Sequence, residues 1–299
     1  MSLATLHPDV VIIAKVSAAL FVAGYGAVGV LSLIPATAKG ARASWPSLFS
    51  ATLSFSVIFA VFLLGGNVLA IALIVIAARI GYEAALVGFA ARGIAFAGAA
   101  VMAVAAIGVL SLPLASVALW LPIAFAGAVM LRFIAGKGAK AEVKTLLTLL
   151  LYPALPVLMF IAAANSTAFG ALVLGSYVLV ETFDSYALLG GKALGKTKAF
   201  PNLSPKKTVE GLAIGALMLI VTTAVIAMIF SPQDLWLAIG IAVVAGGLTL
   251  IGDLAASGLK RAGGVKDFPP VLKQQGGLLD IIDAWITTGA GITLIMIWL

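Results

Sequence analysis

Three aspartates near the end of the chain have the residue type and spacing to hold a metal ion. Asp280 and Asp283 share one face of a helix, because they are three residues apart, and Asp253 ends an earlier apolar run. The chain has no cysteine and only one histidine, His7, which leaves carboxylates as the candidate ligands. Carboxylates suit hard cations such as Mg²⁺. We expect a Mg²⁺ site here; acids offsetting a helix dipole would also explain Asp280.

A basic segment follows Asp253 and has residues typical of phosphate binding. It contains Ser257, Lys260, Arg261, Lys266, Asp267, Gly276 and Gly277. Cations and flexible glycine backbone beside a bound metal suit a polyphosphate. An anchor for anionic lipids is the competing interpretation, but an anchor needs neither carboxylates nor glycines. We expect Lys260 and Arg261 to be catalytic and the rest to bind substrate.

A second polar segment, residues 184–211, is expected to be a loop that also binds substrate. Its candidate residues are Asp184, Lys192, Ser204, Lys206, Lys207, Thr208 and Glu210. Gly190–Thr197 fits the pattern G-x-x-x-x-G-K-[ST], but a P-loop requires a preceding strand and a helix that opens at the Gly-Lys. An apolar span precedes this stretch instead, so we reject a P-loop. For the dipeptide Ser204-Pro205, the start of the next helix is a competing interpretation beside substrate binding.

Long apolar segments must position these residues. Of the 299 residues, 63% are hydrophobic and 10% are charged, against about 25% charged in a soluble domain. This composition excludes a cytosolic enzyme, a secreted module and a disordered chain, and predicts an all-α, polytopic integral membrane protein. A bilayer-spanning helix needs about 20 mostly apolar residues. Ten candidate spans, of which the third and the seventh are short, are Val10–Ile34, Ser47–Leu64, Asn67–Ile80, Gly93–Leu112, Leu114–Leu131, Thr145–Ala163, Ala168–Phe183, Leu212–Phe230, Leu235–Ala256 and Leu278–Trp298.

The number of spans is nine or ten, because Gly81–Arg92 either lies in the interface or extends the third span. The connections on one side of this topology contain 17 of the 18 lysines and arginines; Lys15, in the first span, is the exception. The positive-inside rule makes that side cytoplasmic, with both termini outside. We find no cleavable signal peptide, since the first apolar run is too long and lacks a basic start.

The chain has two unlike parts within what we treat as one membrane domain. Residues 1–165 are apolar helices in which we identify no chemistry, and we interpret Arg79, Glu83 and Glu142 as loop charges. Residues 166–299 contain most of the acids and both polar segments.

The C-terminal residues resemble the signature of the phosphatidate cytidylyltransferase (CDP-diacylglycerol synthase) family. The matching positions are Ser257, Lys260, Arg261, Lys266, Asp267, Gly276, Gly277, Asp280 and Asp283, preceded by Gly252-Asp253. Residues 184–211 are similar to two further blocks of that family, so the resemblance covers about residues 180–284. The sequence departs from the signature at Gln275, where the family has histidine, and at Ile281, where it has arginine.

The resemblance implies a reaction in which CTP and phosphatidic acid give CDP-diacylglycerol and pyrophosphate. It implies that Asp253, Asp280 and Asp283 hold Mg²⁺, and a second cation, K⁺ or Mg²⁺, is compatible with the site. Lys192, Lys206 and Lys207 would complete a basic pocket. The implied partners are CTP, phosphatidic acid or a similar lipid phosphate, and membrane lipids, with a homodimer as the assembly and no nucleic acid. The implied location is a bacterial inner membrane, with the active site at the cytoplasmic face.

Other functions stay open. Gln275 and Ile281 motivate a related lipid-phosphate cytidylyltransferase or a CTP-dependent lipid kinase with another acceptor. A transporter would need charges at the bilayer midplane and interrupted helices in both halves, whereas the charges here cluster at one face. A catalytically inactive scaffold is the remaining alternative.

Overall fold

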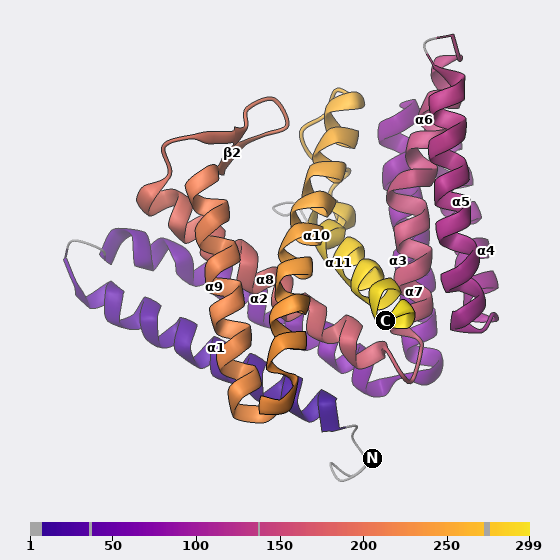
Figure 1. The fold of residues 1–299 in the computed structure, drawn as a ribbon. Coiled ribbons are helices and arrows are strands. Elements are labelled where there is room, and N and C mark those ends of the chain that lie inside the picture. The colour runs from indigo at the N-terminus through magenta and orange to yellow at the C-terminus, as the bar shows by residue number, and fades with distance from the viewer. Residues whose placement is uncertain (1–7, 36–37, 137, 272–275) are drawn as a thin grey trace. The chain divides into compact units, whose positions relative to one another are not determined.

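The computed structural model of the chain describes residues 8–35, 38–136, 138–271 and 276–299 (Figure 1). His7 and Gln275 lie outside these ranges. The described residues are almost entirely helical, which confirms the expected all-α class apart from one small hairpin. Nine of the described helices are long and apolar enough to cross a membrane, and Leu48–Leu64 is a shorter apolar helix. Nine long spans and one short one agree with the predicted nine or ten.

Residue contacts divide the chain into two units, Met1–Leu69 and Ala70–Leu299, so the chemical division at residue 165 falls inside the second unit. The first unit contains the helices α1 (Pro8–Leu33) and α2 (Ala38–Leu64). They pack on each other through aromatic side chains, and the ring centroids of Phe21 and Phe55 are 5.7 Å apart.

The second unit contains the candidate site. Its elements, in chain order, are α3 (Gly66–Phe89, which begins just before the boundary), α4 (Arg92–Leu110), α5 (Leu114–Ala135), α6 (Ala141–Leu149), the π-helical turn η2 (Leu150–Ala154), α7 (Leu155–Ala164), α8 (Gly170–Leu194), β1 (Lys198–Phe200), β2 (Ser204–Thr208), α9 (Val209–Phe230), the 3₁₀ turn η3 (Pro232–Asp234), α10 (Leu235–Ala262) and α11 (Leu278–Trp298).

Two helices are longer than their apolar residues predicted. Helix α3 continues to Phe89, so the segment after Ile80 extends the third span, which was one of the two expected possibilities. Helix α8 continues to Leu194, so the expectation of a loop is wrong for residues 184–194. Polar residues at the end of a span can stay helical because backbone hydrogen bonds are satisfied within the helix.

The predicted sixth span is interrupted by η2. Pro153 cannot donate a backbone hydrogen bond, and Tyr152 before it has an extended backbone (φ −152°, ψ 125°) within the helical run. Short π-helical turns of this kind often occur at functional sites.

Helix α11 is the most buried of the long helices and packs on α7, α8 and α10 (Figure 1). The Trp285 ring makes edge contacts with Phe160 of α7 and Tyr177 of α8, at centroid distances of 4.8 and 5.2 Å. Its indole nitrogen donates to the Val173 carbonyl oxygen at 2.8 Å. These contacts fix the rotation of α11 about its axis, and thereby the direction of Asp283, two residues earlier.

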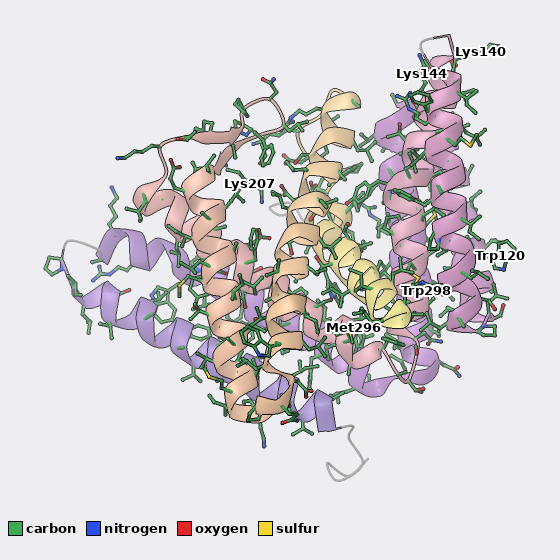
Figure 2. All side chains as sticks on the ribbon, in the orientation of Figure 1. Trp120, Lys140, Lys144, Lys207, Met296 and Trp298 are labelled. Carbon is green, nitrogen blue, oxygen red and sulfur yellow. The ribbon has the colours of Figure 1, made fainter. Side chains whose placement is uncertain are left out.

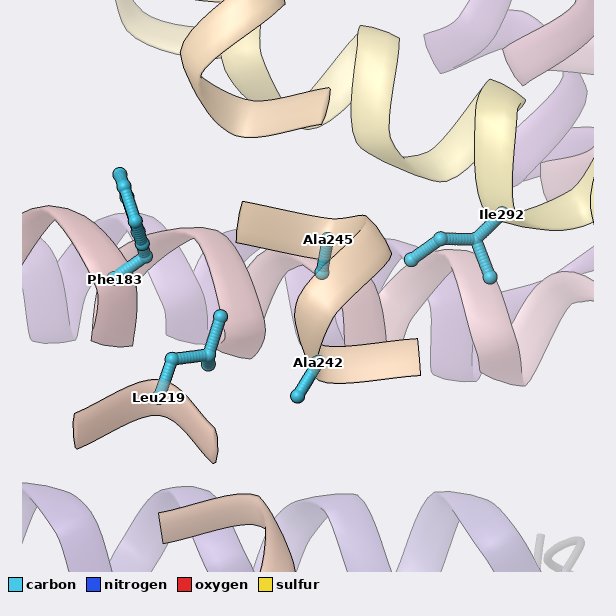
Figure 3. Packing of buried hydrophobic residues seen from close by; sticks show 5 residues of the cluster. All are labelled: Phe183, Leu219, Ala242, Ala245 and Ile292. Atoms are coloured by element: carbon cyan, nitrogen blue, oxygen red, sulfur yellow. The ribbon is translucent and has the colours of Figure 1, made fainter. Parts of the chain in front are cut away.

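Apolar side chains from four helices form a core below this polar end. The cluster in Figure 3 contains Phe183 of α8, Leu219 of α9, Ala242 and Ala245 of α10, and Ile292 of α11. Small residues on α10 allow the larger side chains of its neighbours to approach it closely. The core thus holds α8, α10 and α11 together, and these helices contain the candidate acids.

An antiparallel hairpin of β1 and β2 joins α8 to α9 and was not predicted. Ser204-Pro205 lies in β2, so the interpretation of this dipeptide as a helix start is wrong. Helix α9 starts after Thr208, whose side-chain oxygen accepts a hydrogen bond from the Gly211 amide at 3.2 Å. The Glu210 carboxylate accepts from the amides of Lys196 and Thr197 at 3.1 Å. The hairpin is therefore tied to the first turn of α9.

Candidate active site

The centre of the site is a lysine between two aspartates from different helices. Lys207 lies on β2, and its Nζ is 3.7 Å from Oδ1 of Asp184 on α8 and 3.3 Å from Oδ2 of Asp253 on α10. Figure 2 shows Lys140 and Lys144 at the same end of the second unit as Lys207, with Met296 and Trp298 toward the other end. The structure therefore brings together three predicted site residues that span 70 positions of sequence.

Asp283 of α11 completes what we call the acid cluster, namely Asp184, Asp253 and Asp283. It is only 7% exposed, and the charges of the other two aspartates act on it. A close helix crossing brings α10 and α11 together here: a Cβ added to Gly252 would be 2.8 Å from the Asp283 carbonyl oxygen. One helical turn deeper, the hydroxyl oxygens of Thr249 and Thr288 are 3.2 Å apart.

Asp280 has a different environment, although it is only three residues from Asp283. Its Oδ1 pairs with the Lys260 ammonium at 2.5 Å, and its Oδ2 accepts from the amides of Gly277 and Phe268 at 2.9 and 2.8 Å. Asp280 thus ties the start of α11 to the preceding loop and to α10.

The two glycines of the predicted phosphate loop allow this packing. Gly276 has a φ of +68°, and a Cβ there would be 2.7 Å from Oδ2 of Asp280. A Cβ on Gly277 would be 2.6 Å from Oε2 of Glu83. Both positions therefore need glycine for conformation or space in the folded protein.

The three predicted metal ligands do not form one site, since no group of three acidic, histidine or cysteine side chains in the described residues could hold a metal ion. Asp280 is bound by Lys260 and two amides, whereas the charges of Asp253 and Asp283 act on each other. Oδ2 of Asp253 is buried without a hydrogen-bond donor among the described residues, and the Lys207 ammonium lies 3.3 Å from it. A buried carboxylate oxygen without a donor fits a cation, so Asp253 and Asp283 remain the candidate ligands.

The other predicted residues of the C-terminal segment lie around this centre. Ser257 is buried in α10, one turn after Asp253. Arg261 is exposed, and its Nη1 donates to the Val265 carbonyl oxygen at 2.9 Å. Lys266 and Asp267 line a cavity of about 650 Å³ between the end of α3 and the loop after α10.

The remaining residues of the 184–211 segment do not all face the acid cluster. Lys192 is exposed on the last turn of α8, and Lys206 is exposed on β2, next to the half-buried Lys207. Gly190 and Gly191 lie inside α8, where they allow α9 to pack closely, so the rejection of a P-loop holds. Alternation along β2 explains why only one of the two lysines reaches the acids.

Sequence analysis missed two further features near the site. The Tyr152 hydroxyl is buried near the acid cluster and has no hydrogen-bond partner among the described residues. Glu83, interpreted as a loop charge, is instead a buried residue of α3 that pairs with Arg79 four residues earlier. The i,i+4 spacing of an acid and an arginine inside an apolar run was the available signal, because ionisable residues at such positions are rarely incidental.

Comparison with known proteins identifies relatives of this chain. The cytidylyltransferase family matches residues 47–299. A Staphylococcus aureus protein named phosphatidate cytidylyltransferase is 37% identical over 116 residues, which are 38% of this chain and 44% of that protein. Phosphatidate cytidylyltransferase 4, chloroplastic, of Arabidopsis thaliana is 37% identical over 38% of this chain and 29% of its own length. An uncharacterized Escherichia coli protein, YnbB, is 34% identical over 44% of each chain. Each match thus spans less than half of the relative.

Proposed function

Because the chain belongs to the cytidylyltransferase family, we propose that it is a membrane enzyme that transfers CMP from CTP to phosphatidic acid, giving CDP-diacylglycerol and pyrophosphate. The observation that carries this proposal is the acid cluster with Lys207 at its centre. The names of two relatives support phosphatidic acid as the acceptor. The chain is an integral membrane protein, so a lipid substrate is directly accessible to it.

In this reaction, an oxygen of the lipid phosphate attacks the α-phosphorus of CTP while the bond to the β-phosphate breaks. Asp253 and Asp283 would hold a Mg²⁺ ion, which when bound supplies positive charge to the triphosphate oxygens and the leaving pyrophosphate. Lys207, which lies between Asp184 and Asp253, would add a further positive charge at the cluster. An ionised lipid phosphate is already a nucleophile, so the reaction demands positioning more than a protein base.

The proposed location is the cytoplasmic face of a bacterial inner membrane. Lys140 and Lys144 lie at the same end of the second unit as Lys207 of the site, and the connections that contain these lysines are those that the positive-inside rule assigns to the cytoplasm. CTP would reach the cluster from the aqueous side. The lipid would reach it laterally, with its headgroup at the interface and its chains among the exposed apolar side chains.

The test is turnover by the purified full chain with CTP labelled at the α-phosphate, phosphatidic acid and a Mg²⁺ titration. We expect Mg²⁺-dependent label in the lipid, and we expect Asp283→Asn to lower the rate by at least about 100-fold. Asp234→Asn, which removes an acid of η3 far from the cluster in sequence and structure, is the matched control.

Two outcomes would contradict the proposal. Label that enters the lipid only from γ-labelled CTP would identify a CTP-dependent kinase, and transfer only to another lipid phosphate would change the acceptor. The second outcome has a structural motivation, because Ile281 lies half-exposed on the first turn of α11, where the family signature has arginine.

A further inference from the structure

A buried carboxylate on α3 holds the start of α11. The Glu83 side chain is 0% exposed; its Oε1 accepts from the Leu278 amide and its Oε2 from the Leu279 amide, both at 2.8 Å. These are the first two residues of α11, where backbone amides have no partner within the helix. Gly277, at the preceding position, has no side chain to cap them. Glu83 therefore acts as the cap, supplied by a helix distant in sequence, and its negative charge suits the helix dipole.

Arg79 compensates the charge of Glu83 and extends the contact to the loop. Its Nε is 2.6 Å from Oε1 of Glu83, and its Nη2 donates to the Pro269 carbonyl oxygen at 2.7 Å. A buried carboxylate needs such a partner, and the planar guanidinium can make both contacts at once. The pair thus contacts the segment between α10 and α11 at Pro269, and it contacts the start of α11 that follows this segment.

The same face of α3 also contacts the end of α10. Arg79, Glu83 and Val87 are four residues apart and lie one above the other on the helix. Gly263, just after α10, is so close to Val87 that an added Cβ would be 2.6 Å from the Val87 carbonyl oxygen. One helix face therefore contacts the end of α10, the connecting loop and the beginning of α11.

Asp283 lies one helical turn after Leu279, so the position of the first turn sets the position of its carboxylate relative to Asp253. We infer that Glu83 is a positioning residue for the metal site: from α3, it holds α11 in the place where Asp283 meets Asp253. The inference rests on the proposed function in assigning Mg²⁺ to these two aspartates. The inference thus gives a residue of the N-terminal part, residues 1–165, a role at the site, although the sequence analysis identified no chemistry in that part.

The test compares the full-length wild type with Glu83→Gln, Arg79→Lys and the control Glu142→Gln, an exposed acid on the first turn of α6. Glutamine keeps the size of Glu83, but its amide nitrogen cannot accept a hydrogen bond from a backbone amide. Lysine keeps the charge of Arg79 but cannot bridge Glu83 and Pro269. Hydrogen exchange is measured for peptides containing residues 253 and 278–283, without nucleotide or lipid, over a range of Mg²⁺ concentrations.

We expect faster exchange at residues 278–279 in Glu83→Gln, and a smaller increase in Arg79→Lys. We also expect Mg²⁺ to slow hydrogen exchange in the peptides that contain Asp253 and Asp283. The Mg²⁺ concentration at which this protection is half-maximal should rise by about 10-fold or more in Glu83→Gln and should not change in Glu142→Gln. A merely structural role would reduce the yield of folded protein and leave this concentration unchanged. Wild-type exchange and wild-type Mg²⁺ dependence in Glu83→Gln would overturn the inference.

These measurements need no turnover, so they separate the inference from the proposed reaction. If the wild type transfers no CMP and the Mg²⁺ dependence still shifts in Glu83→Gln, the positioning role stands and the reaction is wrong. If the wild type transfers CMP and Glu83→Gln matches it in Mg²⁺ dependence and exchange, the reaction stands and the positioning role is wrong.

Discussion

At the scale of single side chains, adjacent charges in this protein have different surroundings. Lys207 lies between two carboxylates, while Lys206 beside it is exposed. Likewise, Asp283 belongs to the acid cluster, while Asp280 is held by Lys260 and two amides. Sequence spacing alone treated the members of each pair alike, because spacing identifies neighbours but not the direction in which each side chain is bound.

Replacing the two lysines one at a time tests this difference. We expect Lys207→Met to lower the rate of CMP transfer by about 100-fold, because it removes a positive charge from the reacting centre. Lys206→Met, at an exposed position, is expected to cost less than about fivefold. Steady-state rates at saturating CTP, normalised to folded protein, check the prediction. Equal losses in the two variants would show that both lysines reach the substrate.

At the scale of helices, glycines determine how closely the acid-bearing elements approach. Gly252 lies where α10 meets α11, and Gly211 and Gly215 lie where α9 meets α8. A Cβ at Gly252 or Gly211 would be less than 3.0 Å from backbone atoms of the facing helix, and a Cβ at Gly215 would be 2.8 Å from the Cβ of Ala187. Close crossings through small residues are typical of helices in membranes. Here they bring carboxylates from separate helices into one cluster.

Adding a single methyl group tests the crossing of α10 and α11. We expect Gly252→Ala to lower the free energy of unfolding by about 1–3 kcal/mol, because the methyl group would overlap Asp283 and Ala284. Gly247→Ala on the same helix is the matched control, since its added Cβ would have no atom within 4 Å. Thermal unfolding in one detergent, followed by size-exclusion chromatography, measures both. Equal midpoints for the two variants would contradict the packing argument.

The elements themselves were largely predictable from sequence. Apolar runs predicted the spans, and the last predicted span coincides with α11, because a helix in lipid must satisfy its backbone internally. The π-helical turn and the hairpin were not predictable in this way. Both depend on contacts between distant residues, such as the bond from Glu210 to the Lys196 amide, and hydropathy does not report such contacts.

At the scale of the whole molecule, charge distribution and composition make the topology directly testable. The chain has no cysteine, so each introduced cysteine would be the only thiol in the protein. In intact bacteria, we expect Lys140→Cys, between α5 and α6, to be protected from a membrane-impermeant maleimide. Thr167→Cys, between α7 and α8, should be labelled. The opposite pattern would place the acid cluster on the outer face.

From resemblance and composition, we predicted that the candidate site lies in residues 166–299. The structure adds that the acid cluster draws on α8, α10 and α11, that β2 brings Lys207 to it, and that α3 holds the start of α11. None of these facts follows from the order of residues along the chain. The contact of Glu83 with Leu278 joins positions 195 residues apart.

That separation has a consequence for synthesis. Glu83 is translated long before the amides that it binds, so a nascent chain that has inserted α3 has a carboxylate near the membrane with only Arg79 as its partner. The arrangement is complete only once α11 has been synthesised. A chain that ends before Leu278 would leave Glu83 without these amides, a defect that quality-control proteases could recognise, and the site could not form before α11 is made.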